Sequence, residues 1–181
     1  YESADSPPDV ALMTAADRNE LSDLANVRIH VSRLLKTANG KEKLQRNLMR
    51  WALAYKIGNI EALPAALKQD VDTTGLTNAI SAETKAYIDH VVFNLNGSFN
   101  DLLTSKLSFA SHPSLAKIHG HAPMTGSPLE MNGRRQGLLM RTGFLGGSNP
   151  RTSLITRGAE FQKRVLCNEI PSPTADIVDL R

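Results

Sequence analysis

Apolar side chains recur every three or four residues over much of the chain, which is the spacing of amphipathic helices. This pattern predicts helices over residues 19–37, 41–56, 78–95 and 99–107. Asn39 and Gly40 are expected to end the first helix, and Ser81 to cap the third. Trp51 falls on the apolar face of the second helix, so we expect it to pack in the core or between subdomains. No pair of strands is predicted.

Three segments lack the helical pattern. Residues 1–18 are polar and contain two adjacent prolines, which predicts an extended arm or linker. Residues 58–75 are less regular and indicate a short helix near Pro64 followed by a turn. Residues 108–133 are dense in proline and glycine and predict a long irregular connection. Connections of that length in compact domains are often functional.

The C-terminal part, residues 134–173, predicts two helices, over 134–145 and 153–167, joined by a loop over 146–153. The predicted fold class is therefore all-α: an irregular helical domain with long loops and a C-terminal helix–loop–helix. The predicted division of the chain is an arm over residues 1–18, a helical module over 19–131 and the helix–loop–helix module over 132–181, which we expect to continue into a missing or separate segment.

Composition narrows the function classes. The 181 residues are 41% hydrophobic and 22% charged, which is typical of globular proteins. A net charge of +3 is too small to indicate nucleic-acid binding. No stretch reaches the roughly 18 apolar residues that a membrane-spanning helix needs. The chain begins at Tyr1 without a signal-peptide pattern, so we expect a processed chain, a trimmed chain or a fragment.

Three histidines, His112, His119 and His121, cluster in the irregular connection. Neutral imidazole is a common metal ligand, so these residues are candidates for contact with a metal or a haem. The cluster lacks the helical spacing of zinc proteases and has no cysteine or glutamate in register. The other interpretation is that these histidines form hydrogen bonds to the backbone of the loop.

The loop over residues 146–153 lies among arginines and also has two interpretations. Candidate residues for an anion or a partner are Arg135, Asn149, Arg151, Ser153 and Arg157. Ser153 could cap the following helix, whose N-terminus favours negative charge. Alternatively, Arg135 or Arg157 binds loop carbonyls and acidic residues such as Glu83, Asp89 or Asp101. We favour this structural role because buried loop backbone needs hydrogen-bond partners.

Cys167 is the only cysteine, and it is predicted to close the last helix. A single cysteine cannot form an internal disulfide, so it is either an inert thiol or a candidate for a disulfide to another segment or chain. A catalytic role is disfavoured because the C-terminal end of a helix destabilises a thiolate. No catalytic residue is identified from the sequence.

Two sets of motifs support a family resemblance. The first set is Glu83-Thr84, then FNDLLTS over residues 99–105, then LAKIHG over 115–120. It resembles an "ET…F" helix, an "L-T-D-L-L" segment and an "L-A-x-x-Y-G" turn, with His119 in place of the tyrosine. The second set is RQGLL over 135–139, SNPRTS with Arg157-Gly158, and Leu166-Cys167 followed by Pro171 and Pro173. It is similar to "R-x-G-L-L", "S-N-P-T-R-T-S-P-x-x-R-G" and "L-L-C-x-x-x-P-P-P-P".

These motifs resemble two adjoining uncharacterised domains of large secreted, planctomycete-type, cytochrome-associated proteins. The similarity covers about residues 78–175, and the earlier helices fit by pattern alone. The resemblance implies a periplasmic or extracellular protein. Members commonly continue into a Cys-x-x-Cys-His segment that binds haem c, and this sequence contains no such motif. We therefore expect no cofactor bound by this chain alone, and haem c in the remainder of the polypeptide or in a partner.

Two functions follow as expectations. The first is a helical scaffold or subunit of a secreted or periplasmic assembly that contains a c-type cytochrome and serves electron transfer or oxidation. Its partners would be the remainder of the polypeptide or other subunits. The alternative is a stand-alone secreted enzyme, a hydrolase or an oxidase, with its site in the loop from His112 to His121.

Overall fold

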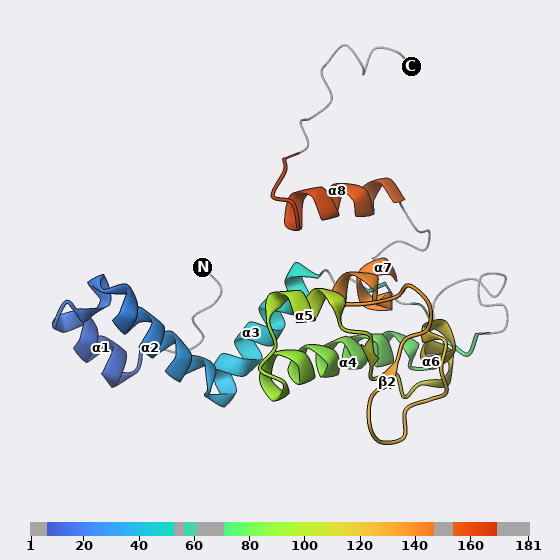
Figure 1. Cartoon of the computed structure of the whole chain (residues 1–181), viewed down its shortest axis with the longest axis horizontal. Helices are drawn as coiled ribbons and strands as arrows, with labels where there is room; N and C mark the ends of the chain where they lie inside the picture. The colour runs from blue at the N-terminus through green and yellow to red at the C-terminus, as the bar shows by residue number, and fades with distance from the viewer. Residues whose placement is uncertain (1–6, 53–56, 59, 61–70, 147–153, 170–181) are drawn as a thin grey trace, which may run out of the picture.

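The computed structural model describes residues 7–52, 57, 58, 60, 71–146 and 154–169. These residues form a mostly helical molecule with one short pair of strands, and the all-α prediction is confirmed. The α1–α2 pair lies at one end of an elongated arrangement, and α6 with the strands lies at the other (Figure 1). Helices α3, α4, α5 and α7 occupy the middle, and α8 lies alongside them.

The N-terminal end is a helical hairpin made of α1 (Val10–Asp17), the 3₁₀ turn η1 (Glu20–Ser22) and α2 (Leu24–Leu35). The prediction of an extended arm is wrong for residues 10–17. Asp9 caps α1 by accepting a hydrogen bond from the Leu12 N–H and also pairs with Arg33 of α2. Arg33, followed by the Leu12 N–H, lowers the pKa of Asp9 to about 2. The long-range contact with Arg33 could not be deduced from a local pattern.

Helix α3 (Ala38–Trp51) follows α2 almost directly. Asn39 and Gly40 were predicted to end the preceding helix, but they lie in the first turn of α3. Thr37 caps that turn by accepting the Gly40 N–H at 3.0 Å. A Cβ atom at Gly40 would lie 2.0 Å from the Leu34 carbonyl oxygen, so glycine is needed because α2 and α3 meet closely here.

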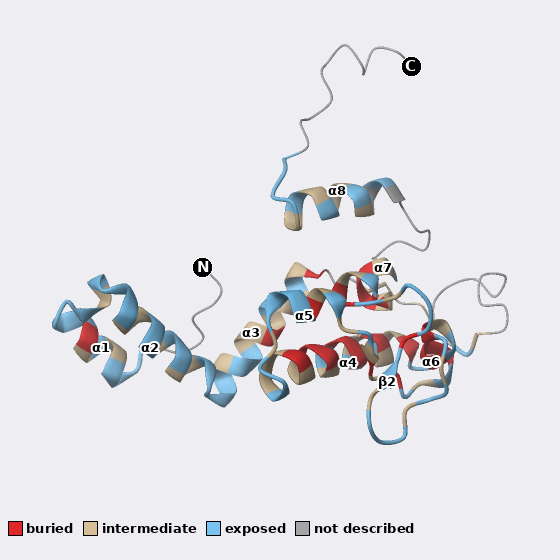
Figure 2. Cartoon of the chain, in the orientation of Figure 1, coloured by how far each residue is buried: buried red, intermediate tan, exposed pale blue. Residues whose placement is uncertain are grey.

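The core forms around α4 (Leu76–Asp89), which continues into the π-helical turn η4 (His90–Asn94). The buried side of α4 is the one that the sequence predicts, although the helix begins at Leu76 rather than at residue 78, so Ser81 does not cap it. One apolar cluster surrounds the middle and the C-terminal end of α4 and a second surrounds its N-terminal end, as the buried residues in Figure 2 show. The first contains Tyr87, Ile88, Val91, Leu102 and Leu138, and the second contains Leu76, Ile80, Ala110 and Leu115.

Helix α5 (Phe99–Thr104) packs beside the end of α4. Ser98 and Asp101 form a reciprocal capping box at its start, which satisfies two backbone N–H groups that the helix leaves unbonded. After α5 the chain forms β1 (Leu107–Ser108), which pairs antiparallel with β2 (Leu129–Glu130). The prediction of no strand pair is therefore wrong. Strands of two residues are too short to show a sequence alternation.

The segment over residues 108–133 is more ordered than predicted, because it contains the helix α6 (Pro113–His119). His112 caps α6, Pro113 occupies its first turn, and Gly120 ends it with a left-handed φ of 82°. Proline at the start and glycine just past the end are standard helix boundaries. In a segment dense in both residues these boundaries are hard to distinguish from loop.

The predicted helix over 134–145 is also replaced. Gly137 interrupts it with φ 65° and ψ −177°, and the chain then forms the 3₁₀ turn η5 (Leu138–Met140) and the short helix α7 (Thr142–Gly146). Leu138 joins the core cluster of Tyr87, across the predicted module boundary at residue 131. That boundary itself stays a prediction. Helix α8 (Leu154–Arg164) ends three residues before Cys167, so the cysteine does not close the helix as predicted.

Candidate functional site

The most buried charged group in the described part of the chain is the guanidinium of Arg141, which lies at the start of α7. It forms an ion pair with Glu83 of α4 and donates a second hydrogen bond to the Leu107 carbonyl of β1. Its Cζ atom lies 3.3 Å from the centre of the Tyr87 ring. Arg141 is 0% exposed and Glu83 is 3% exposed. We call Arg141, Glu83 and Tyr87 the Arg141 cluster.

The Arg141 cluster joins four segments that lie between residues 76 and 146 of the chain. Glu83 also accepts a hydrogen bond from the Phe109 N–H at 3.2 Å, and the Tyr87 hydroxyl donates to the Leu102 carbonyl at 2.9 Å. Burial raises the pKa of the Tyr87 hydroxyl, and the positive charge of Arg141 partly offsets this effect. The cluster therefore fixes α4, α5, β1 and α7 in one arrangement, because a buried charge must keep its partners.

A second polar group is centred on His119, the last residue of α6. Its Nδ1 atom lies 2.7 Å from the Ser108 hydroxyl, and its Nε2 atom lies 3.3 Å from the Thr142 hydroxyl. The first distance is that of a nucleophile and its base. However, Ser108 is 0% exposed and His119 is 1% exposed, so in this fold no substrate reaches the Ser108 hydroxyl. The geometry supports a role in holding α6 against β1 and α7.

His112 and His121 do not join His119 in a common ligand set. His112 accepts the Ser114 N–H on Nδ1, so its Nε2 donates to the Thr74 carbonyl at 2.9 Å. The Nδ1 atom of His121 donates to the Ala122 carbonyl at 2.6 Å, and its Nε2 atom is buried with no hydrogen-bond partner. The rings of His119 and His121 lie edge to face, 6.0 Å apart. Within the described ranges, no group of three or more His, Cys, Asp or Glu side chains is placed to hold a metal ion.

We predict that His119 makes the stability of the protein depend on pH. Burial, followed by the positive charge of Arg141, lowers the pKa of His119 from 6.5 to about 4. Between these values the unfolded chain binds more protons, so the contribution of His119 to stability is complete above pH 6.5 and is lost as the pH falls to about 4. The full effect is roughly 3 kcal/mol. Urea unfolding of wild type and H119N across this pH range measures it.

H119N is expected to show a shallower loss of stability than wild type over that range, because asparagine does not titrate. H112N is the matched control: asparagine is a good helix cap, so it keeps the capping role of His112, and the wild-type pH dependence should persist. Equal slopes for wild type and H119N would contradict the assignment to His119.

The predicted arginine site lies partly outside the described residues, which do not include Asn149, Arg151 or Ser153. Arg135 and Arg157 are both half-buried, and the Nε atom of Arg157 has no hydrogen-bond partner. Glu83 was a predicted acidic partner for an arginine of this region, and Glu83 does bind one. That arginine is Arg141, which was not among the candidate residues.

Cys167 lies just beyond α8 and is exposed, with a left-handed φ of 54°. Helix α8 contacts α3, because the indole Nε1 of Trp51 donates to the Arg164 carbonyl at 3.1 Å. The Trp51 ring also packs against Phe99 of α5 at 5.6 Å. Trp51 is thus a packing residue between helices.

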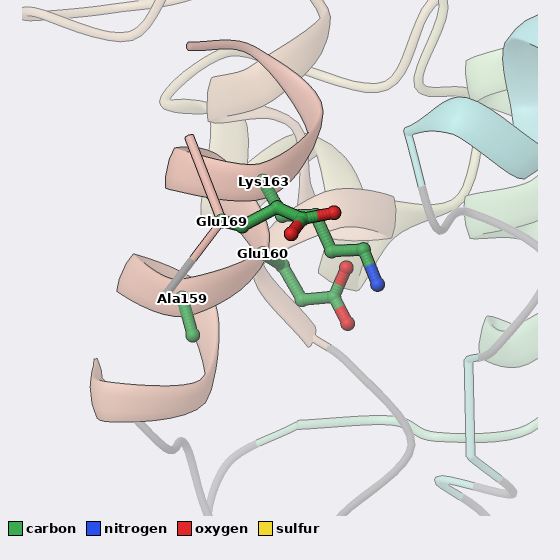
Figure 3. Close-up of a pocket in the computed structure, with 4 residues that line it drawn as sticks. All are labelled: Ala159, Glu160, Lys163 and Glu169. Carbon is green, nitrogen blue, oxygen red and sulfur yellow. The ribbon is translucent and has the colours of Figure 1, made fainter. Parts of the chain in front are cut away.

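A small surface hollow beside the end of α8 is lined by Ala159, Glu160, Lys163 and Glu169 (Figure 3).

The arrangement defines the chain as a mostly helical domain whose buried polar groups join its own segments. Comparison with known families adds a family to this description. The family described as "PSD4: Protein of unknown function (DUF1592)" matches residues 1–120, and the chain belongs to this family. No curated protein and no solved structure matches the chain. The match covers residues 19–120 of the first predicted module, over 19–131, and the second module, over residues 132–181, lies beyond it.

None of the helices in the described part of the chain is long and apolar enough to cross a membrane.

Proposed function

We propose that this chain is a helical scaffold or subunit of a secreted or periplasmic assembly that contains a c-type cytochrome, with the haem carried outside the chain. The assembly would serve electron transfer or oxidation. Membership of the DUF1592 family identifies the domain but names no activity for it. The motifs over residues 78–175 support the cytochrome association, because the proteins that they resemble carry haem c in a following segment.

The observation that carries the scaffold role is the distribution of polar and apolar side chains. Ionisable and polar groups that could perform chemistry, such as Ser108, His119 and Arg141, are buried and bonded to the protein itself. Large apolar side chains lie instead at the surface of the helices at the two ends of the chain. They include Val10, Met13, Leu24 and Ile29 near the N-terminus and Ile155, Phe161 and Leu166 in and after α8. Exposed apolar surface of this kind is typical of a protein that binds other segments.

Cys167 provides a chemical link for such an assembly. Its thiol is at the surface, so a disulfide to another segment or chain needs no rearrangement of the core. In a periplasmic or extracellular compartment such a bond would persist. Alanine or serine at this position should leave the fold unchanged, because the side chain of Cys167 is exposed.

The test uses the protein isolated from its natural source without reductant. We expect an absorption spectrum with the bands of haem c in the purified complex and a disulfide that joins Cys167 to a peptide outside residues 1–181. Non-reducing peptide mass spectrometry identifies that peptide, and reduction should separate the two. A free Cys167 together with no haem at any stage of a native purification would contradict the proposal. C167S, which cannot form a disulfide at this position, is the control for disulfides formed during handling.

A further inference from the structure

The α1–α2 hairpin buries very little of its own apolar surface. Ala15 is the only buried residue in α1, and α2 has none, whereas α4 has six. Figure 2 shows this contrast between the α1–α2 end of the helical arrangement and its middle, where α4 lies. On α2 the exposed fractions are 61% for Leu24, 63% for Ile29 and 47% for Val31. A twelve-residue helix with this much exposed aliphatic surface is suited to bind a further element.

The spacing on α2 indicates the shape of that element. Leu24, Val31 and Leu35 are separated by seven and four residues, so they share one face of the helix. With Arg28 they occupy successive d, a, d and a positions of a heptad. We call these four residues the α2 seam. A seam with this spacing packs against another helix, which places its own side chains between the residues of the seam.

The charges around the α2 seam indicate the chemistry of the partner. Residues 24–41 contain four basic residues, Arg28, Arg33, Lys36 and Lys41, and no Asp or Glu. Arg33 pairs with Asp9, whereas neither Arg28 nor Lys36 forms an ion pair with any acidic residue that the structure describes. A broad, shallow hollow beside the seam is lined by Arg28, Ile29, Ser32, Arg33 and Lys36.

We infer that the α2 seam is a docking site for an acidic amphipathic helix, with aliphatic residues on one face and Glu or Asp beside them. The aliphatic residues would cover Leu24, Val31 and Leu35. The acidic residues would neutralise Arg28 and Lys36, which remain unpaired within the described chain. The inference deepens the scaffold role by naming the surface that holds a partner, and it rests on that role without requiring the partner to carry haem.

Two other occupants fit the charges less well. In a symmetric pair of copies of this chain, the same basic surface would face itself, and opposed like charges disfavour the contact. A bilayer surface would need a continuous apolar face to enter the acyl region. On α2, the charged Arg28 lies within the seam, and Ser32 and Lys36 separate the seam from Ile29, so the apolar surface is divided.

In the test, the full chain is used to select binders from a library of displayed helices, each about three heptads long. Each displayed helix carries leucine at a and d and an equal mixture of Glu, Lys, Gln and Ala elsewhere. We expect the bound population to be enriched in Glu at the positions that flank the leucines. A synthetic peptide of the selected sequence should bind the chain more weakly at high salt.

Variants assign the binding to the α2 seam. R28E/K36E should weaken the selected peptide at least tenfold, and L24Q/V31Q should do the same through the apolar half of the contact. The matched control is K85E/K117E, which reverses two exposed charges on α4 and α6. It should bind like wild type. Circular dichroism should show the same helix content for all variants, because every changed side chain is exposed.

Several outcomes would overturn the inference. In the selection, they are enrichment in Lys, Gln or Ala, or the absence of any bound helix. With the selected peptide, the contradicting outcome is equal binding by R28E/K36E and wild type. Self-association through this face in analytical ultracentrifugation, or tighter binding to phosphatidylglycerol vesicles than to the peptide, would also contradict it. The selection uses no cytochrome. A failure to find haem with the natural protein would therefore contradict the cytochrome assembly and leave this result standing.

Discussion

Replacing Arg141 with methionine is expected to lower the free energy of unfolding by about 3–5 kcal/mol, because it leaves the buried carboxylate of Glu83 without its charge partner. The same change removes the hydrogen bond to the Leu107 carbonyl and the contact with the Tyr87 ring. These contacts join segments from different parts of the core, so the loss should appear as one cooperative transition at lower urea concentration. Urea denaturation followed by circular dichroism measures it.

Two controls separate the buried ion pair from a general effect of losing an arginine. R18M removes an arginine side chain that is 70% exposed and 3.9 Å from Glu20, and it should change stability by less than about 0.5 kcal/mol. In E83Q/R141M no charge is left buried, and the glutamine can still accept the Phe109 N–H. The double variant should therefore be more stable than R141M. If R141M were as stable as R18M, the Arg141 cluster would not hold the core together.

Replacing Gly137 with alanine is expected to cost about 3 kcal/mol or more, since two separate obstacles act at this residue. Its φ of 65° with ψ of −177° belongs to a region that glycine alone adopts readily. A Cβ atom there would also lie 1.8 Å from the Leu103 carbonyl oxygen. The Gly137 N–H donates to the Ser105 carbonyl at 2.7 Å, so the backbone cannot move away without losing that bond.

Alanine substitutions at two other glycines distinguish the effect of backbone strain from the effect of a steric clash. Gly133 has a φ of 71°, but a Cβ atom added there would meet open space, so G133A should cost about 1 kcal/mol from backbone strain alone. Gly126 has neither a left-handed φ nor a neighbour within 4 Å of an added Cβ atom, so G126A should be neutral or slightly stabilising. The expected order of stability is G126A, then G133A, then G137A. If G137A were as stable as G133A, the close approach to Leu103 would not be what makes Gly137 necessary.

The residues around Gly137 and those of α4 differ in how far a local sequence pattern predicts them. The buried face of α4 was predictable, because Ile80, Thr84, Tyr87, Ile88 and Val91 repeat at helical spacing and all become buried. The helix over residues 134–145 was not, although RQGLL fits a helical pattern. Gly137 must leave the helical region to pass the Leu103 carbonyl, and only the packing of α5 creates that requirement.

The sequence predicted that the candidate site would contain an arginine bound to an acidic residue, but not which arginine that would be. The sequence predicts that an arginine of the C-terminal region binds an acid such as Glu83, with Arg135 and Arg157 as the candidates. Arg141 takes this place because α7 packs on α4 and positions that guanidinium over Tyr87. His119 was a candidate metal ligand, yet its neighbours Ser108 and Thr142 lie 11 and 23 residues away. No local signal indicated that they would be its partners.

The sequence by itself determined the mostly helical class, the buried face of α4 and the family resemblance, because each depends on spacing within a short stretch. The tertiary structure decided which buried charges pair, where α1 and α6 form, and which apolar residues stay exposed on α2. These features depend on contacts between residues far apart in the chain. Asp9 with Arg33 and Glu83 with Arg141 are such contacts, and a local pattern carries no information about which of several arginines will reach an acid.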